Sequence, residues 1–295
     1  MKNWLRQLRV HQWVKNLLVF VPLLASFQFL SNLDGVASLA FAFLAFSLVS
    51  SAVYIFNDLL DLENDRAHSI KRNRPLASGK ISVLQGLVVG IVLLVLGIAL
   101  GFMAGYQFLL VLFAYLVLTF VYSIWLKRIS LVDVIALAAL YTLRVVAGGS
   151  ATGIELSFWL LAFSVFFFLS LAWVKRYAEL ESLQKSGGST AVGRGYLVTD
   201  MPLILVFGAA SAFLAVLIFA LYLDSSAIRE QYALPEVGWL AIPFLMYLIS
   251  RMWFKAHRGQ MNQDPLLFLF RDWPSIVTVV LLGASLVFAH LGVGL

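Results

Sequence analysis

The residues best suited to do chemistry in this sequence gather where a long apolar run ends. Asp58, Asp61 and Asp65 follow one another at intervals of three and four residues. On a continuous helix this spacing predicts one shared face for the three carboxylates, with Tyr54 one turn below and Asn57 beside them. Carboxylate oxygens and an amide carbonyl are ligands that suit a hard cation such as Mg²⁺.

A basic run closely follows the acidic stretch and contains Lys71, Arg72 and Arg74, ahead of Pro75. Carboxylates that hold Mg²⁺, together with cations that neutralise the remaining phosphate charge, are the two components of a diphosphate site. The alternative is a solvated acidic helix end. Because acidic residues at a helix C-terminus oppose the helix dipole, the combined pattern favours the diphosphate site.

The composition indicates that lipid is the solvent for most of the chain. Of its 295 residues, 62% are apolar and 12% are charged, and the mean hydropathy is +0.93. Soluble domains are about 45–50% apolar and about 25% charged, so soluble proteins are excluded. The sequence contains no cysteine, which excludes a disulfide framework and a thiolate metal site.

Nine apolar stretches have the length of a transmembrane helix, and they are apolar on every face, unlike the strands of a membrane barrel. We therefore predict an all-α integral membrane protein with a single domain, residues 1–295. The predicted spans are residues 15–31, 36–57, 82–103, 106–125, 131–149, 156–175, 201–223, 237–254 and 274–292.

The distribution of Lys and Arg sets the predicted orientation. If the N-terminus is cytoplasmic, every basic residue except Arg144 and Arg229 falls on the cytoplasmic side, and the C-terminus lies outside. The net charge of +6 then reflects topology, and no nucleic-acid partner is expected. The long polar segments 58–81, 175–200 and 255–273 share the cytoplasmic side, so we expect the chemistry there.

One motif resembles the first signature of the UbiA-type membrane prenyltransferase superfamily. It reads Asn57-Asp58-x-x-Asp61-x-x-x-Asp65, followed by Lys71-Arg-x-Arg-Pro-Leu-Ala-Ser-Gly79. The likeness extends to Tyr122-Ser-x-x-Leu-Lys127 after the fourth predicted span and to Asp133 in the fifth. The resemblance implies nine helices around a cavity open to the cytoplasmic side, in a bacterial-type inner membrane.

The region after the sixth span departs from the usual pattern of that superfamily, which has a second aspartate-rich motif there. This chain reads Lys175-Arg176-Tyr177-Ala-Glu179-Leu-Glu181. The segment resembles the decaprenyl-phosphate phosphoribosyltransferase branch, whose members transfer 5-phosphoribose from phosphoribosyl pyrophosphate to a polyprenyl phosphate. Donor and acceptor together bring three anionic groups, which require more cations than a prenyl diphosphate does.

The resemblance also implies residue roles. Asn57 and Asp61 would bind Mg²⁺ with Asp58 or Asp65 assisting, and Asp58 and Asp61 would be catalytic. Arg144 lies inside a predicted span, where a charge either binds the lipid phosphate or forms a structural contact. The residues implied to bind the donor are Lys15, Tyr54, Lys71, Arg72, Arg74, Lys127, Arg128, Lys175, Arg176 and Tyr177.

Two other functions compete with phosphoribosyl transfer. A prenyltransferase that moves an isoprenoid to an aromatic or other small acceptor would use the same metal cluster, but it normally has the second acidic motif. A secondary transporter of anionic metabolites would show an inverted repeat, and the acidic motif occurs only once. Lipid length and oligomeric state, including a homo-oligomer, are left open by the sequence.

The orientation can be tested with topology reporters. A reporter fused after Leu295 should behave as external, and one inserted in the 186–195 loop should behave as cytoplasmic, because three predicted spans, an odd number, separate the loop from the C-terminus. Finding both reporters on the same side of the membrane would contradict the predicted count of nine spans.

Overall fold

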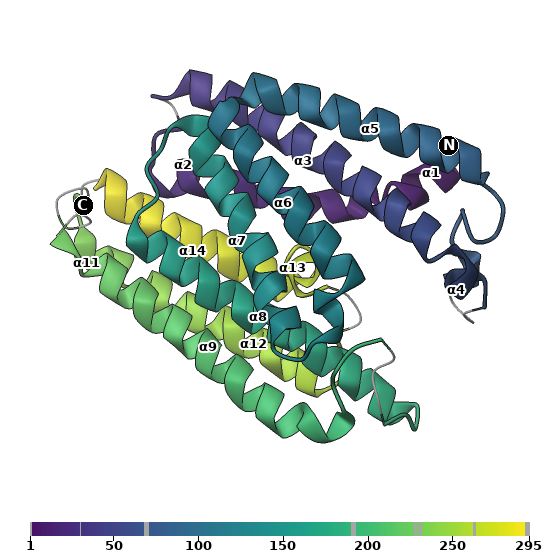
Figure 1. Cartoon of the computed structure of the whole chain (residues 1–295). Helices are drawn as coiled ribbons and strands as arrows, with labels where there is room; N and C mark the ends of the chain where they lie inside the picture. Colours follow the sequence, from purple (N-terminus) through teal and green to yellow (C-terminus); the bar gives the residue numbers. More distant parts are fainter. Residues whose placement is uncertain are drawn as a thin grey trace. The chain divides into compact units, whose positions relative to one another are not determined.

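The computed structural model describes residues 2–29, 31–67, 71–189, 193–226, 229, 232–261 and 264–292, and they are predominantly helical (Figure 1). The chain divides into two compact units. Unit 1 comprises Met1–Trp125 and Leu143–Leu156, and unit 2 comprises Leu126–Thr142 and Ser157–Leu295. One of the three boundaries between them falls inside the helix α7 (Val132–Thr152). The single-domain assignment stays a prediction.

In the described part of the chain, eight helical segments are long and apolar enough to cross a membrane, which confirms the predicted all-helical membrane fold. They correspond to the second to ninth predicted spans. Short helices η4 (Val198–Asp200) and α11 (Pro235–Gly238) precede two of them. The long helices are α3 (Leu33–Leu60), α5 (Val83–Ala104), α6 (Tyr106–Ile124), α7 (Val132–Thr152), α8 (Phe158–Lys185), α9 (Met201–Leu223), α12 (Ala241–His257) and α14 (Trp273–Leu291).

The first predicted span, residues 15–31, differs from the structure. The chain forms the 3₁₀-helix η1 (Val10–Phe20) and the short helix α2 (Val21–Ala25), and Phe27 then adopts a left-handed conformation, φ 54°, that ends the helical path. The helical segment begins at Val10, but the apolar run used for the prediction begins only after Lys15 and Asn16, because these two polar residues lie inside the segment. The count of nine membrane-spanning helices is therefore not confirmed.

The length of Val10–Ala25 is nonetheless informative. A 3₁₀-helix rises roughly 2.0 Å per residue and an α-helix roughly 1.5 Å. The 11 residues of η1 and the 5 of α2 would together extend about 30 Å, which is about the thickness of the hydrocarbon core. Because the 3₁₀-helix rises more per residue, this segment is as long as an α-helix with more residues would be.

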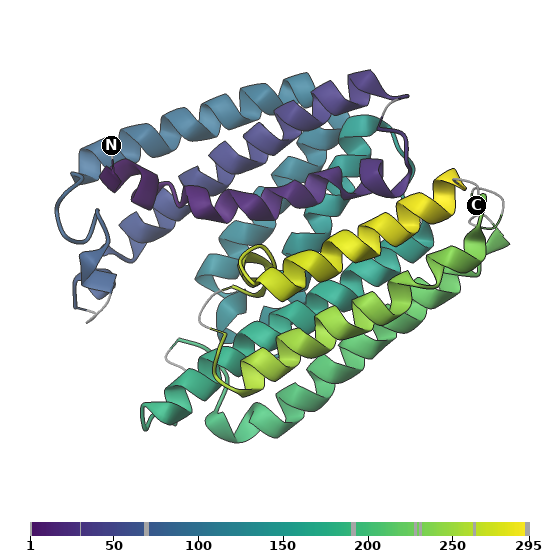
Figure 2. The same cartoon turned by 180° about the vertical axis from the view of Figure 1, so that it is seen from behind.

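Unit 1 is organised around the close pairing of α3 and α5, which lie side by side in Figures 1 and 2. The buried residues of α5 are Gly86, Gly90, Gly97, Gly101 and Ala104, so a stripe of small residues faces the neighbouring helices. A Cβ atom on Gly97 would meet a methyl carbon of Val49 at 2.7 Å and the carbonyl oxygen of Ala45 at 3.2 Å. Small residues allow two membrane helices to approach backbone to backbone.

Unit 2 contains a second close approach, between α9 and the helices α8 and α12. A Cβ atom on Gly208 would lie 2.0 Å from the Trp253 ring and 2.9 Å from the Cβ atom of Trp173. The Ser170 hydroxyl donates a hydrogen bond to the Gly208 carbonyl oxygen, and Trp253 Nε1 donates to Ser170 Oγ at 3.1 Å. Figure 2 shows α9, α12 and α14 running alongside one another in this unit.

Substitution of Gly97 tests the α3–α5 contact. Gly97→Leu should lower the free energy of unfolding by about 1–3 kcal/mol or more, because the added side chain meets the backbone of α3. Gly283→Leu on α14 is the matched control, since a Cβ atom there meets nothing within 4 Å. Thermal unfolding in detergent should separate the two variants, and equal melting temperatures would contradict the close-packing role.

Candidate functional site

The acidic stretch does not lie on one continuous helix. Helix α3 ends at Leu60, Asp61 caps it through a backbone N–H bond to the Asn57 carbonyl oxygen, and α4 (Leu62–Ala67) follows. The three aspartates therefore separate into two environments. Asp58 and Asp65 are buried, at 4% and 2% exposure, whereas Asp61 is exposed. The predicted shared face of three carboxylates is corrected accordingly, because the α-helix is interrupted at the middle aspartate.

Asp58 and Asp65 are neutralised by arginines within unit 1. Arg74 Nη1 lies 3.0 Å from Asp58 Oδ1 and 2.6 Å from Asp65 Oδ2, so one guanidinium bridges both carboxylates. Arg9 Nη2 lies 2.8 Å from Asp58 Oδ1, and Gln7 Nε2 donates to Asp58 Oδ2 at 2.8 Å. The acidic stretch and the basic run thus bind each other in this arrangement.

Sequence reasoning missed Arg9 and Gln7, which belong to the N-terminal segment that begins with α1 (Lys2–Gln7). The Arg9 guanidinium also lies 4.5 Å from the ring centre of Tyr54, one of the predicted donor-binding residues. The only feature of the sequence that could have indicated these two residues is the basic character of the N-terminal segment. Membrane orientation already accounts for that basic character, so it did not single out Arg9 or Gln7. Nothing in the spacing of the chain points Arg9 toward Asp58.

Asn57 and Asp61 are the two residues of the acidic stretch whose side-chain oxygens are open to a ligand, and we call them the open pair. Asn57 donates its side-chain N–H to Ser123 Oγ on α6 at 3.1 Å, which leaves the amide oxygen as an acceptor. In the described part of the chain, the Asp61 carboxylate forms no ion pair. One residue therefore offers an amide oxygen and the other a solvent-exposed carboxylate, one helical turn apart.

These two oxygens fit the coordination habits of Mg²⁺. Among the described residues, no group of three or more His, Asp or Glu side chains is arranged to hold a metal ion. Magnesium does not require such a cage, because it is usually bound by one or two protein ligands, with water and substrate phosphates completing the octahedron. Asn57 and Asp61 would hold the ion, and Asp58 and Asp65 would align the neighbouring arginines.

The predicted phosphate-binding cations occupy different environments. Lys15 is buried on η1, whereas Lys71 and Arg72 are exposed on the short helix η2 (Lys71–Asn73). In unit 2, Lys127 is half-buried and Arg128 is exposed on η3 (Leu126–Arg128). Exposed cations that follow the acidic stretch are suited to neutralise phosphate oxygens.

Arg144 lies inside a polar network of unit 1. Its Nε donates to Asn16 Oδ1 and its Nη2 to Tyr115 OH, both at 3.0 Å, and the guanidinium lies 4.8 Å from the Tyr115 ring centre. Asn16 in turn donates to Ser47 Oγ on α3 at 3.1 Å. These contacts connect η1, α3, α6 and α7 through a side chain that is only 6% exposed. A role in binding the lipid phosphate stays a prediction.

Arg176 forms a buried ion-pair network in unit 2. Its guanidinium contacts both carboxylate oxygens of Asp133, with Nε 2.5 Å from Oδ2, and also pairs with Glu179. Arg194 adds a second guanidinium, 3.0 Å from Asp133 Oδ1 and 3.2 Å from Glu179 Oε1. Asp133 is fully buried and Arg176 is 1% exposed. This geometry gives Arg176 a structural partner in place of the open anion site that the motif predicted.

Tyr196 completes the surroundings of this network. Its hydroxyl accepts a hydrogen bond from the Leu131 backbone N–H at 2.9 Å. Burial raises the pKa of the Tyr196 hydroxyl to about 12, so the group stays protonated at neutral pH. Tyr196 therefore acts as a neutral hydrogen-bonding group near two guanidiniums and the Asp133 carboxylate.

Lys175 contacts the segment that follows α12, and Tyr177 contacts the last residue of α12. Lys175 Nζ lies 3.3 Å from Asp264 Oδ2, and the Tyr141 hydroxyl donates to the same carboxylate at 3.0 Å. Tyr177 OH lies 2.9 Å from His257 Nδ1. Asp264 also caps α13 (Pro265–Leu269), a role that its position before a proline could have revealed. Lys175 is one-third exposed and is the accessible cation of its motif.

Comparison with known proteins identifies the family. The model of the UbiA prenyltransferase family matches residues 18–272. The chain therefore belongs to the UbiA family of membrane transferases, which confirms the resemblance carried by the acidic motif.

Three relatives illustrate the range of the family. An uncharacterized protein, y4nM, of Sinorhizobium fredii is 42% identical over 98% of this chain, but the match spans only 56% of that protein. The nodulation protein NoeC of Azorhizobium caulinodans is 35% identical over 95% of this chain and 91% of its own length. The decaprenyl-phosphate phosphoribosyltransferase of Mycobacterium tuberculosis is 37% identical over 62% of each protein.

A solved structure shows the same fold. The UbiA homolog from Archaeoglobus fulgidus bound to DMAPP and Mg²⁺ matches with a TM-score of 0.71 at 21% identity, over 99% of this chain and 100% of that chain. At this identity the likeness establishes the fold alone.

Asp61 and Asp65 provide a test of the two acidic environments. Asp61→Asn should abolish the thermal stabilisation that Mg²⁺ with pyrophosphate gives to the protein, because it removes the open carboxylate ligand. The variant's melting temperature without ligands should stay near that of the wild type.

Asp65→Asn is the matched control. It leaves the guanidinium of Arg74 less well neutralised and should lower the melting temperature even without metal. If Asp61→Asn retains the full response to Mg²⁺ and pyrophosphate, the assignment of Asn57 and Asp61 as the metal pair is wrong.

Proposed function

We propose that this protein transfers 5-phosphoribose from phosphoribosyl pyrophosphate to a polyprenyl phosphate, with Mg²⁺, and releases pyrophosphate. Membership of the UbiA family supports a transferase that acts on a diphosphate donor. The 37% identity with decaprenyl-phosphate phosphoribosyltransferase supports this particular donor and acceptor. We further propose an inner-membrane location with the N-terminus in the cytoplasm.

The observation that carries the proposal is the state of the carboxylates at the end of α8. Asp133 and Glu179 pair with Arg176 and Arg194, Glu181 pairs with Lys185, and Asp264 pairs with Lys175. Within the described part of unit 2, each of these four carboxylates is therefore already paired with a cation, so none of them is left unpaired to hold a second Mg²⁺. A transferase that held a prenyl diphosphate between two acidic motifs would need carboxylates that are left unpaired.

The acidic stretch of unit 1 would bind the diphosphate end of the donor. Asn57 and Asp61 would hold Mg²⁺, which shields the charge of the diphosphate when bound. Exposed Lys71 and Arg72 would neutralise the remaining phosphate charge. Asp58 would act as a positioning residue for the two arginines that contact it, rather than as a metal ligand.

The proposed reaction needs little covalent chemistry from the protein. An oxygen of the lipid phosphate forms a bond to C1 of ribose, and the bond between C1 and the pyrophosphate oxygen breaks with its electron pair on pyrophosphate. The lipid phosphate is already deprotonated at neutral pH, so no general base is required. Positioning and electrostatic stabilisation of the departing pyrophosphate supply the rate enhancement.

The substrates can be distinguished directly. Purified protein in detergent, with Mg²⁺ and a polyprenyl phosphate, should convert labelled phosphoribosyl pyrophosphate into a labelled lipid and lose this activity when Mg²⁺ is chelated. The parallel reaction contains a labelled prenyl diphosphate with aromatic acceptors. Consumption of the prenyl diphosphate, with none of the phosphoribosyl donor, would establish prenyl transfer instead.

Lys175 and Arg176 should respond differently to substitution. Lys175→Ala should weaken donor binding by about ten- to a hundredfold, the usual value of a charge-assisted hydrogen bond, and leave the polyprenyl phosphate constant less affected. Arg176→Ala should instead destabilise the protein by about 3–5 kcal/mol, because Asp133 loses its buried partner.

Binding and thermal-unfolding measurements on both variants, with Lys185→Ala as the exposed control on the same helix, separate these effects. Unchanged donor binding in Lys175→Ala would remove Lys175 from the site.

A further inference from the structure

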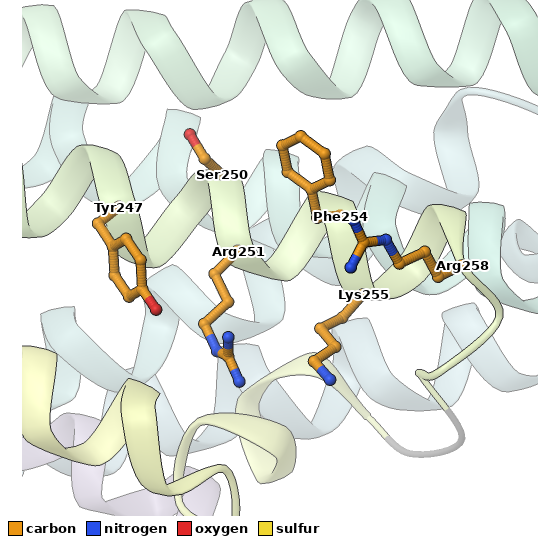
Figure 3. A pocket seen from close by; sticks show the side chains of 6 residues that line it. All are labelled: Tyr247, Ser250, Arg251, Phe254, Lys255 and Arg258. Carbon is orange, nitrogen blue, oxygen red and sulfur yellow. The ribbon is translucent and has the colours of Figure 1, made fainter.

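A cavity of about 290 Å³ lies along the C-terminal half of α12, apart from every residue assigned above to the donor or the metal. Its cations, Arg251, Lys255 and Arg258, recur at helical spacing. Figure 3 shows the side chains of Tyr247, Arg251 and Lys255 extending to the same side of α12. The lining residues are Tyr247, Ser250, Arg251, Phe254, Lys255 and Arg258.

Among the described residues, two of the three cations have no acidic partner. Arg251 is held by Asp272, with Nε 2.7 Å from Oδ2 and Nη2 2.8 Å from Oδ1, and these hydrogen bonds keep the pKa of Asp272 well below its usual value. Lys255 Nζ contacts the neutral Gln260 Oε1 at 2.8 Å. The Arg258 guanidinium lies 5.4 Å from the Phe254 ring centre. In the described part of the chain, Lys255 and Arg258 therefore carry positive charge that no carboxylate balances.

An apolar groove adjoins this cavity and shares Tyr247 with it. The groove measures about 580 Å³ and lies between α12 and α14, two helices that pack together in unit 2 (Figure 2). Tyr247 thus stands where a cationic cavity meets an apolar one. The residues that give the groove its aromatic and aliphatic walls are Phe244, Tyr247, Trp273, Pro274, Val277 and Leu281.

We propose that this surface binds an anionic phospholipid, with the headgroup phosphate at Lys255 and Arg258 and an acyl chain in the groove between α12 and α14. The charge of the cavity complements a phosphate, and the adjoining walls complement hydrocarbon. Basic pockets between transmembrane helices are established sites for anionic headgroups. An aromatic residue with a polar tip, such as Tyr247, is suited to the boundary between head and chain.

Topology alone would account for Lys and Arg at this end of α12, but not for the cavity that they line or for the apolar groove beside it. On α8, Lys175, Arg176 and Lys185 each contact a carboxylate. Lys255 and Arg258 differ because they line a cavity that continues into an apolar groove. An anionic bilayer lipid supplies both the missing charge and the apolar chain.

The test measures lipid binding to the delipidated full-length protein in detergent by native mass spectrometry. The two main ligands are phosphatidylglycerol and phosphatidylcholine with identical acyl chains, and a polyprenyl phosphate forms the third arm. The wild type should prefer phosphatidylglycerol. Lys255→Gln/Arg258→Gln should weaken that binding about thirtyfold and leave phosphatidylcholine binding nearly unchanged.

Two further variants separate the headgroup from the chain. Val277→Trp fills the groove without changing the charge, so it should weaken the binding of both phospholipids. Lys185→Gln/Arg229→Gln removes two exposed positive charges elsewhere in unit 2 and should leave both unchanged.

Equal binding of the two phospholipids by the wild type, or wild-type phosphatidylglycerol binding in Lys255→Gln/Arg258→Gln, would overturn the proposal. Tighter binding of polyprenyl phosphate than of phosphatidylglycerol, lost in the same double variant, would overturn it in favour of an acceptor site. Neither result depends on phosphoribosyl transfer.

Discussion

Charge buried in an apolar bundle needs a partner, and this constraint organises the protein. Removing a charge from water costs several kcal/mol unless an opposite charge or well-placed hydrogen bonds compensate. Asp133 is fully buried and is met by the guanidiniums of Arg176 and Arg194. Asp58 and Asp65 are met in the same way by Arg74. The two pairings of Asp133 connect segments that are 43 and 61 residues apart in the sequence, so they hold α7, α8 and the segment after α8 together.

The same constraint divides the polar residues of the chain into two groups. Buried residues whose charge is already balanced, such as Asp58 and Arg176, hold the structure in place around a site. Residues that keep an unbalanced oxygen or cation at the surface, such as Asp61 and Arg72, are available to a ligand. The motifs and the family resemblance that they carry assigned both groups to the site, because a motif specifies residue types and intervals but not the partner that each side chain finds.

Much of the fold could be predicted because its signal is local. A run of apolar residues identifies a membrane helix without reference to the rest of the chain, and the second to ninth spans follow this rule. The segment Val10–Ala25 does not, because polar residues inside it are buried within unit 1. Asn16, for instance, accepts from Arg144, a residue 128 positions away. Contacts at that separation leave no periodic pattern, so neither the 3₁₀-helix nor its polar face could be anticipated.

Lys175, Arg176 and Tyr177 stand where a second acidic motif was expected, and the number of cations alone does not describe the difference. The pairing of the nearby carboxylates matters as well. Four carboxylates, Asp133, Glu179, Glu181 and Asp264, surround this end of α8, yet each pairs with a cation. Acidic residues are therefore present, but their charge is balanced within unit 2 instead of being offered to a metal ion.

In the proposed reaction, a metal-bridged diphosphate would depend on Asn57 and Asp61, the open pair among the described residues of the acidic stretch, and any further phosphate would be met by cations directly. Direct contact between Lys or Arg and phosphate requires no second metal ion, because a charge-assisted hydrogen bond supplies both attraction and orientation. A donor with phosphate groups at both ends suits a site that recognises one end through a metal ion and the other through side chains. One end can share Mg²⁺ with the acidic stretch, while the other can be recognised by side chains alone.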